Sequence, residues 1–217
     1  MKTLKAEQGS AQWLADRAGR PTASQFGRII TPKTGKLSTQ AHGYMCQLVG
    51  ERLLGQAEEI PTTYAMERGT ELEPEAREAF QLITGHTVTE VGLCLTDDER
   101  IGASPDGLIY SDQLVGGLEL IYSEKLVGGL ELKCPGMRKH MEYLIGDKCP
   151  DEYIMQVQGC LFVTGAPKWY FMSYFPGLPP LIIEVLPDAK VQAALADNLP
   201  AFCDQIDKHE QEIRSIA

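Results

Sequence analysis

The hydrophobic period of the chain changes near Gly85, and this change restricts the fold more than any other feature. Before Gly85, apolar residues recur at helical spacing. After it, most segments alternate like strands and are separated by turn residues. We expect helices at 12–18, 40–54, about 71–84, 151–163 and 188–216, and strands at 86–96, 101–110, 128–135, 169–175 and 181–186. This order predicts an α/β fold with a central mixed β-sheet flanked by helices. Pro200 should kink or interrupt the last helix.

The length of 217 residues suits one well-buried domain and is marginal for two. Because no linker rich in Gly, Ser or Pro divides the chain, we expect a single domain over 1–217. No apolar stretch approaches the roughly 20 residues that span a bilayer. The N-terminal residues MKTLKAEQGSAQW lack the apolar core of a secretory signal. These features predict a cytoplasmic protein that does not bind membranes.

Cysteine spacing and charge narrow the classes of function. The six cysteines form no CxxC pair and have no His cluster beside them, which argues against structural zinc and iron–sulfur sites. We expect them to be mostly small buried apolar residues. The net charge is −10, but residues 1–60 carry eight Lys or Arg against five Asp or Glu. An acidic protein can still hold a polyanion if its cations line one groove and metal ions bind there too.

One internal repeat interrupts the strand pattern. Residues 109–120 (IYSDQLVGGLEL) and 121–132 (IYSEKLVGGLEL) are identical at ten of twelve positions. A single duplication cannot build a solenoid, so we interpret it as a local insertion between two strands. We predict that 132–135 continue the core strand from the second copy. The first copy should extend a hairpin beyond the core or form a mobile loop.

The residues with the clearest chemistry flank this repeat. Asp106 lies in the turn Ser104-Pro105-Asp106-Gly107, and Glu131 and Lys133 lie two apart in a predicted strand, so they project from one face. If the two strands pair, two carboxylates and one ammonium converge. Such carboxylates suit Mg²⁺, which can activate water and stabilise a phosphoryl group under attack. Lys133 can then orient the water or neutralise the developing charge.

Each of these motifs has an ordinary structural interpretation when taken alone. An ExK pattern in a strand is usually solvent-facing, and SPDG is a good turn. The two together, in order, are more specific. Glu119 occupies the equivalent place in the first copy, but Ile121 stands where the lysine would be. We therefore assign the site to Glu131 and Lys133 of the second copy.

Three further groups of residues are candidates, and each has an ordinary structural alternative. Glu73 lies near the start of a predicted helix, where a carboxylate usually caps the helix or faces solvent. Arg17 can chelate phosphate with its planar fork, and Ser24 can complete a phosphate pocket at a helix start. The alternative is an amphipathic helix followed by a capped turn. Gln156 and Gln158 lie in one predicted helix and would ordinarily be surface or capping residues.

Taken together, these segments resemble the lambda-type phage exonucleases, or YqaJ-like viral recombinase nucleases, of the PD-(D/E)xK superfamily. The matching segments are WLADRAGRPTAS, GTELEPEAR, SPDG, LELKCP and YIMQVQGCLFVTG, in family order from residue 13 to 165. The resemblance implies a restriction-endonuclease-like core. It also implies Mg²⁺- or Mn²⁺-dependent degradation of linear double-stranded DNA from a 5′ end. A ring-shaped trimer around DNA and a single-strand-annealing protein partner are implied as well.

The resemblance also implies a role for each matching residue. The metal ligands would be Glu73, Asp106, Glu131 and the backbone carbonyl of Leu132. Lys133 would position or activate water, and Gln156 would support the nucleophile. The 5′-phosphate would be bound by Arg17, Ser24 and Ser104.

The duplication departs from the family pattern, because it leaves 24 residues between Asp106 and Glu131 instead of 12. The residues alone do not show cleavage polarity, and only the Arg17 and Ser24 pocket favours 5′ ends. A restriction-type endonuclease and a 3′-directed nuclease therefore stay open as alternatives. A non-enzymatic DNA-binding protein with a decayed site ranks below them, because all the expected ionisable residues are present.

Overall fold

The computed structural model describes residues 1–58, 63–115 and 121–216. Its elements, in chain order, are β1 (Lys2–Leu4), α1 (Ala11–Arg17), the 3₁₀ turn η1 (Ala23–Gln25), α2 (Phe26–Ile29), α3 (Ala41–Leu54), α4 (Tyr64–Thr84), β2 (Val88–Thr89), β3 (Leu93–Leu95), β4 (Gly102–Ala103), β5 (Gly107–Val115), β6 (Ile121–Lys133), α5 (Met137–Gly146), α6 (Asp151–Thr164), β7 (Trp169–Ser173), β8 (Leu181–Val185) and α7 (Ala189–Arg214).

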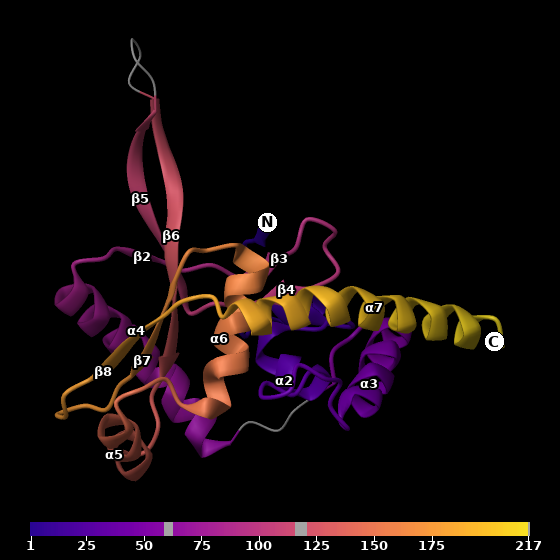
Figure 1. Cartoon of the computed structure of the whole chain (residues 1–217), viewed down its shortest axis with the longest axis horizontal. Helices are drawn as coiled ribbons and strands as arrows, with labels where there is room; N and C mark the ends of the chain where they lie inside the picture. Colours follow the sequence, from indigo (N-terminus) through magenta and orange to yellow (C-terminus); the bar gives the residue numbers. More distant parts are fainter. Residues whose placement is uncertain (59–62, 116–120, 217) are drawn as a thin grey trace.

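Five strands form the central sheet, in the order β2-β5-β6-β7-β8 (Figure 1). Strands β6 and β7 are parallel, and the other neighbouring pairs are antiparallel. A parallel pair needs a crossover connection, which α5 and α6 provide. Strands β1, β3 and β4 form a separate three-stranded sheet. The predicted α/β architecture with a mixed sheet flanked by helices is confirmed.

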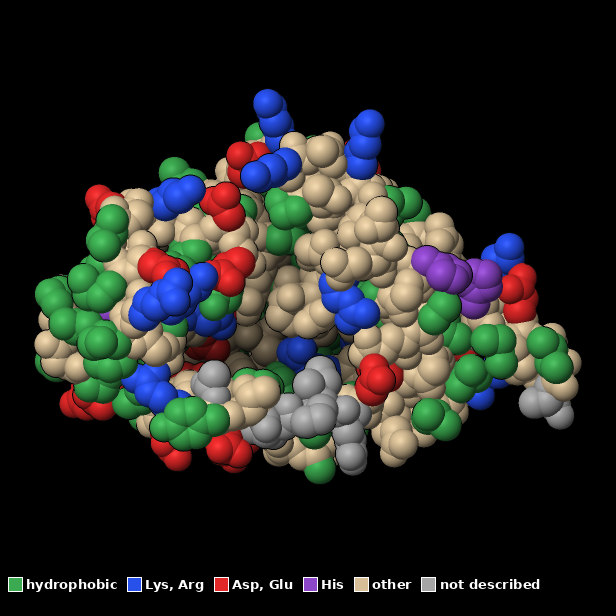
Figure 2. All heavy atoms as spheres, turned by 90° about the horizontal axis from the view of Figure 1, so that it is seen from below, with side chains coloured by type: hydrophobic (Ala, Val, Ile, Leu, Met, Phe, Trp, Pro, Cys, Tyr) green, Lys and Arg blue, Asp and Glu red, His purple; other side chains and the backbone are tan. Residues whose placement is uncertain are grey.

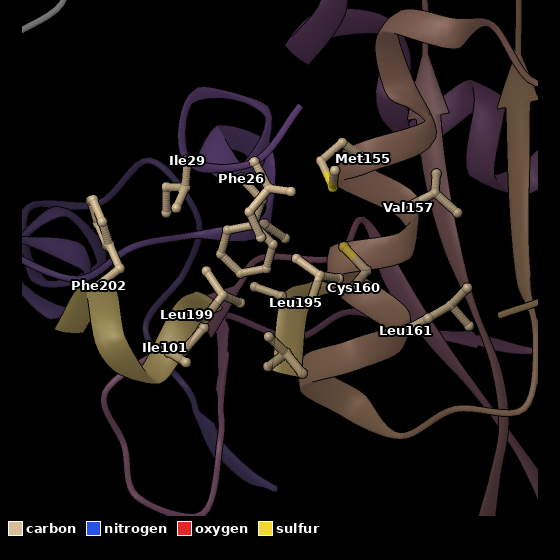
Figure 3. Close-up of a cluster of buried hydrophobic side chains, with 14 of the residues drawn as sticks. Phe26, Ile29, Ile101, Met155, Val157, Cys160, Leu161, Leu195, Leu199 and Phe202 are labelled. Carbon is tan, nitrogen blue, oxygen red and sulfur yellow. The ribbon is translucent and has the colours of Figure 1, made fainter. Parts of the chain in front are cut away.

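The two faces of the central sheet contribute to different hydrophobic clusters. The larger cluster joins α2, α3, α6 and α7 to the sheet face that carries Phe171, and Figure 3 shows part of it. The smaller cluster packs Ala76 and Phe80 of α4 against Leu130 and Leu132 of β6. Because side chains alternate along a strand, a residue between those two leucines points to the opposite side, toward α6.

The duplicated segment forms a hairpin that projects beyond the rest of the sheet (Figure 1). β5 and β6 pair from Gly107 with Leu130 out to Val115 with Ile121, with an irregularity after Ile109. The first copy thus supplies most of β5, and the second copy supplies β6. The prediction of a hairpin extension is confirmed. The tip at 116–120, which includes Glu119, lies outside the described residues.

The glycine pair of the second copy fits closely against the neighbouring strand. Trp169 of β7 is fully buried and lies opposite Gly129. A Cβ atom on Gly129 would lie only 2.3 Å from the indole ring, so only glycine leaves room for it. The core strand reaches Lys133, two residues short of the predicted end at Pro135, and begins earlier than the predicted residue 128.

Two predicted strands are each divided between the two sheets. The segment 86–96 splits into β2 and β3, and 101–110 splits into β4 and β5. At Gly92 the chain passes so close to the end of β1 that a Cβ atom there would lie 2.7 Å from the Leu4 carbonyl and 2.3 Å from the Ala6 carbonyl just beyond it. Pro105, which has no N–H to donate to a ladder, lies between β4 and β5. The prediction of one continuous strand in each of these two segments is therefore wrong.

The helices differ from the prediction at four places, one of which is the short helix α2, which was not predicted. α4 begins at Tyr64 instead of about Glu71 and contains Pro74, which a later start would have placed in the first turn. Helix α5 was not predicted. The prediction that Pro200 interrupts the last helix is wrong, because α7 runs through it continuously. Apolar residues on both sides of Pro200 hold this helix against the core; they are Leu195, Leu199, Phe202, Cys203 and Ile206.

Two general expectations can be compared with the structure. Five of the six cysteines are buried, and Cys46 is exposed, so their interpretation as buried apolar residues is confirmed for most of them. None of the helices in the described part of the chain combines the length and the apolar character needed to cross a membrane.

The register of the hairpin predicts that the first copy is dispensable. Deleting 109–120 joins Leu108 to Ile121, so Ile121 and Tyr122 take the places of Ile109 and Tyr110. The pairing next to the core is then restored, and three residues remain to close the turn, a common hairpin length. Shortening a loop by twelve residues changes its closure free energy by only on the order of 1 kcal/mol.

We therefore expect the deletion variant to stay soluble, to unfold cooperatively near the wild-type temperature and to retain Mg²⁺-dependent nuclease activity. Circular dichroism melting and a digestion assay on linear DNA measure both properties. Insoluble or inactive protein would show that the first copy is structural.

Candidate active site

Asp106 is attached directly to the second copy of the repeat. Its backbone N–H donates to the carbonyl of Leu130 at 3.2 Å. Its carboxylate Oδ2 accepts a hydrogen bond from the backbone N–H of Leu132 at 2.6 Å. Both bonds go to β6, on either side of Glu131. The predicted pairing of the SPDG turn with the second copy is therefore present in the fold.

Glu131 is the centre of a buried polar cluster on the α6 side of the sheet. Its side chain is inaccessible to solvent. Its Oε1 atom is contacted by Lys133 Nζ and accepts a hydrogen bond from Gln156 Nε2 of α6 at 2.5 Å. The Lys133 ammonium also lies 5.3 Å from the centre of the Tyr153 ring. Glu131 and Lys133 share one face of the strand, as their spacing predicts.

The charges in this cluster are only partly compensated. Burial raises the pKa of the Glu131 carboxyl to about 7; Lys133 opposes the shift, and Asp106 adds to it. Burial also raises the pKa of Asp106. Burial by itself would lower the pKa of Lys133, but Glu131 and Asp106 together raise it above its ordinary value. One ammonium is thus shared by two buried carboxyls, and additional positive charge would stabilise both as carboxylates.

The same residues fit a divalent cation in donor type and charge. The second carboxylate oxygen of Glu131, Oε2, is buried and has no hydrogen-bond partner within the described structure. A buried acceptor without a partner is costly, and a hard cation would satisfy it. Asp106, Glu131 and Leu132 all line one cavity. Within 1–58, 63–115 and 121–216, however, no three His, Cys, Asp or Glu side chains are gathered as a metal site.

Glu73 lines the same cavity from α4, on the other side from α6. It lies in the middle of that helix, so the alternative of a helix-capping carboxylate does not hold. Burial raises the pKa of Glu73, and the negative charge of Asp106 raises it further. Glu73 is thus close enough to Asp106 for that charge to shift its pKa, but it makes no hydrogen bond to the buried cluster in the described structure.

Arg17 and Ser104 form a second polar group in the cavity. The Arg17 guanidinium donates to Ser104 Oγ at 2.8 Å and to Thr22 Oγ1 at 3.3 Å. Trp13 lies one helical turn earlier on α1; its ring stacks 4.3 Å from the guanidinium carbon, and its N–H donates to Ser104 Oγ. Ser24 Oγ lies 3.4 Å from Thr22 Oγ1. These groups are suited to binding an anion.

Close packing on α6 brings the two polar groups into one cavity. A Cβ atom on Gly159 would lie 2.6 Å from the Phe26 ring and 2.9 Å from the Ala23 side chain. The turn that carries Ser24 therefore rests directly on the helix that carries Gln156. This close approach is why a serine early in the chain and a glutamine late in it can face the same space.

The cavity has a volume of about 680 Å³ and contains every site residue that the sequence predicted. Those residues are Arg17, Ser24, Glu73, Ser104, Asp106, Glu131, Leu132, Lys133 and Gln156. The face of the molecule in Figure 2 is hollowed, and Lys and Arg side chains lie in and around the hollow. Gln158 does not join the site, because it binds the Leu186 carbonyl and the Asp188 N–H next to α7.

Sequence reasoning missed several residues that line the cavity. Trp13 had a usable signal, because it is four residues from Arg17 and therefore on the same face of a helix. Tyr153 had a similar signal, three residues before Gln156. Lys139 lies on α5, which was not predicted, and its ammonium is paired with Glu152 at 3.1 Å. Nothing in the local sequence distinguishes Lys139 from an ordinary surface lysine.

Comparison with known proteins places this chain in a family. The model of the YqaJ-like viral recombinase domain matches residues 12–167. The structure of LHK-Exo in complex with dAMP is 32% identical, has a TM-score of 0.78, and covers 95% of this chain and 97% of that chain. A second structure of LHK-Exo, an alkaline exonuclease from Laribacter hongkongensis, is 31% identical with a TM-score of 0.74, covering 96% and 100% of the two chains.

A third structure, a phage-related exonuclease from Haemophilus somnus 129PT, is 14% identical with a TM-score of 0.63 and covers 91% of this chain and 96% of that chain. At that identity it supports the fold alone. No curated protein matches the chain. Because the family model spans most of the chain and LHK-Exo exceeds 30% identity over nearly its whole length, the chain belongs to the YqaJ-like viral recombinase family and is a nuclease similar to alkaline exonucleases.

Proposed function

We propose that this protein is a Mg²⁺-dependent exonuclease that degrades linear double-stranded DNA from the 5′ end. The products would be mononucleotides and 3′ single-stranded tails for recombination by strand annealing. One observation carries the proposal: a single cavity holds both the acidic cluster around Glu131 and the cationic group around Arg17. The first suits phosphodiester hydrolysis, and the second suits a terminal phosphate.

Asp106, Glu131 and the Leu132 carbonyl would hold the cation, with Glu73 completing the set from α4. When bound, Mg²⁺ supplies an activated water and neutralises charge on the phosphoryl group. Mn²⁺ can substitute because it prefers similar oxygen ligands. The ammonium of Lys133 is kept beside Glu131 and can orient the nucleophile or stabilise negative charge. Gln156 fixes the rotamer of Glu131 through its hydrogen bond.

The position of Arg17 supports the proposed 5′ direction of digestion. A terminal phosphate monoester carries more charge than an internal diester, so a half-buried guanidinium selects the end of a strand. Ser24 and Ser104 would donate further hydrogen bonds. LHK-Exo, which is similar to this chain, has been captured with dAMP, and a nucleoside monophosphate is the product expected of such a reaction.

The partners proposed here come from the family resemblance. Lambda-type exonucleases act as ring-shaped trimers on DNA ends together with a single-strand-annealing protein. We extend both features, the homotrimer and the annealing partner, to this chain. An acidic protein of net charge −10 gains most from such a ring, because enclosure retains DNA without requiring strong bulk attraction.

The substrate topology tests the function most directly. Purified protein with Mg²⁺ should degrade linear duplex DNA and leave covalently closed circular DNA of the same sequence intact, because the circle has no end. Gel electrophoresis after equal incubation measures both. Cutting of the circle would favour the endonuclease alternative. Digestion that releases the 3′ label of a duplex before its 5′ label would favour the 3′-directed one.

Substitution at the acidic cluster tests the chemistry. Glu131→Gln and Lys133→Ala should each reduce cleavage on the order of 100-fold or more, the usual cost of removing a group that stabilises transition-state charge. Both variants should keep the wild-type circular dichroism spectrum. Glu119→Gln, in the first copy, is the matched control and should be nearly silent. Comparable losses at Glu119 and Glu131 would show that the site was assigned to the wrong copy.

Substitution at Arg17 tests end recognition. Arg17→Ala removes charge-assisted hydrogen bonds worth about 1.5–3 kcal/mol, so digestion of 5′-phosphorylated ends should slow roughly 10- to 100-fold. Digestion of 5′-hydroxyl ends, measured on the same duplex, should change much less. An equal loss on both substrates would mean that Arg17 acts through packing, for example against Trp13.

A further inference from the structure

Helix α4 is held beside the active site by few apolar contacts. Its buried apolar residues are Ala76 and Phe80, which belong to the smaller of the two hydrophobic clusters. Both lie C-terminal to Glu73. In the half of the helix before Glu73, the described residues add only Leu72, which is partly buried against the same cluster, while Met66 is exposed. The position of Glu73 relative to the sheet therefore needs other interactions to define it.

Arg77, one turn after Glu73, fastens α4 to the SPDG turn. Its Nε atom donates to the backbone carbonyl of Asp106 at 3.3 Å. Another nitrogen of the same guanidinium pairs with Glu90 at 2.8 Å. Only 14% of the Arg77 side chain is exposed, against 71% for Glu90, so the arginine is the anchored partner. A planar guanidinium can make both contacts at once.

Arg68, five residues before Glu73, fastens the other half of α4 to the end of β6. One of its terminal nitrogens donates to the carbonyls of Cys134 at 2.8 Å and Pro135 at 2.9 Å. Its guanidinium also lies 5.0 Å from the centre of the Phe175 ring. These carbonyls directly follow Lys133 in the chain. The two arginines thus bind backbone carbonyls just before β5 and just after β6, next to the buried cluster. Glu73 lies between them on the helix.

We propose that Arg68 and Arg77 are positioning residues that set the approach of Glu73 to Asp106 and Glu131, and so set the affinity of the site for a divalent cation. The inference rests on the proposed function, since it takes Glu73 as the third carboxylate of that site. Neither arginine lines the cavity, so neither is expected to touch DNA at the cleavage point.

An electrostatic role and a positioning role predict opposite changes in cation affinity when one of these arginines is removed. Arg77 places a positive charge near both Glu73 and Asp106. If it acted only through its field, removing it would strengthen the binding of a cation. If it positions Glu73, removing it should weaken binding, because loss of a group that orients a metal ligand typically costs about 10-fold or more in affinity.

The experiment measures Mn²⁺ binding to the full-length protein without DNA, by titration calorimetry or by the electron paramagnetic resonance signal of free Mn²⁺. Arg77→Ala and Arg68→Ala should each weaken Mn²⁺ binding about 10-fold or more. Arg68→Lys should restore most of the affinity, because one ammonium can donate to both carbonyls. Arg77→Lys should not, because an ammonium cannot replace a fork that bridges Asp106 and Glu90.

Arg100→Ala is the matched control. Arg100 also fastens a helix to a loop, through Asp204 and Asp207 of α7, and it does not line the cavity. Its removal should leave Mn²⁺ affinity unchanged. Thermal midpoints identify any variant that has unfolded. If an alanine variant unfolds, Arg77→Lys, which keeps the charge but loses the fork and should still bind Mn²⁺ more weakly, decides in its place, and Arg68→Lys serves only as the rescue variant. Unchanged or tighter Mn²⁺ binding in the folded Arg68 and Arg77 variants would overturn the inference.

The proposed function and the positioning role of the arginines can be refuted separately. A wild-type protein that binds no Mn²⁺ and shows no metal-dependent cleavage would refute the proposed function, and the positioning role with it. A wild-type protein that binds Mn²⁺ and cleaves DNA, with arginine variants that bind equally well, would refute only the positioning role.

Discussion

The candidate active site depends on one unfavourable feature, the complete burial of the Glu131 carboxyl group. Removing an ionised carboxylate from water costs several kcal/mol unless nearby charges and hydrogen bonds compensate. Lys133 and Gln156 both reach one oxygen of Glu131, and the other oxygen has no partner in the described structure. The unpaired oxygen is suited to binding a cation. Apolar packing around the cluster keeps these charged groups close together.

On the side of the sheet that Glu131 faces, helix α6 packs against the sheet and against α2 and α7. It supplies Gln156 to the site and Gln158 to the connection between β8 and α7, two residues with similar sequence context and different roles. Gly159 lets the Ser24 turn approach the helix more closely than any larger residue would allow. The cluster around Glu131 and the turn that carries Ser24 are adjacent because both rest on this one helix.

The duplication lengthens two strands of the sheet and leaves the residues of the candidate site in place. The two copies differ by an even number of residues, so each side chain would face the same way in either register. Gly129 opposite Trp169 and Lys133 at the strand end belong to the second copy's pairing. The additional residues therefore extend outward as paired strands, away from the cavity. The core next to Asp106 is undisturbed.

Much of this protein was determined by the sequence alone. Local periodicity predicted most helices and strands, and i to i+2 spacing placed Glu131 and Lys133 on one face. Short motifs named nine of the residues that line the cavity. Those signals are local, so they survive without knowledge of the fold. The beginning of α4, the continuity of α7 through Pro200 and the division of two segments between sheets were decided by tertiary contacts, which override local propensity.

The arrangement of the site was also decided by the tertiary structure. Arg68 and Arg77 bind backbone carbonyls far away in the chain, and a carbonyl carries no sequence signal. The approach of Ser24 to Gln156 needs a glycine on α6, whose role is visible only beside Phe26. Whether Glu73 caps a helix or faces a cavity depended on where α4 begins. Sequence determines which groups are available, but burial and the distances between distant segments determine which of them act together, because both arise only when the chain packs.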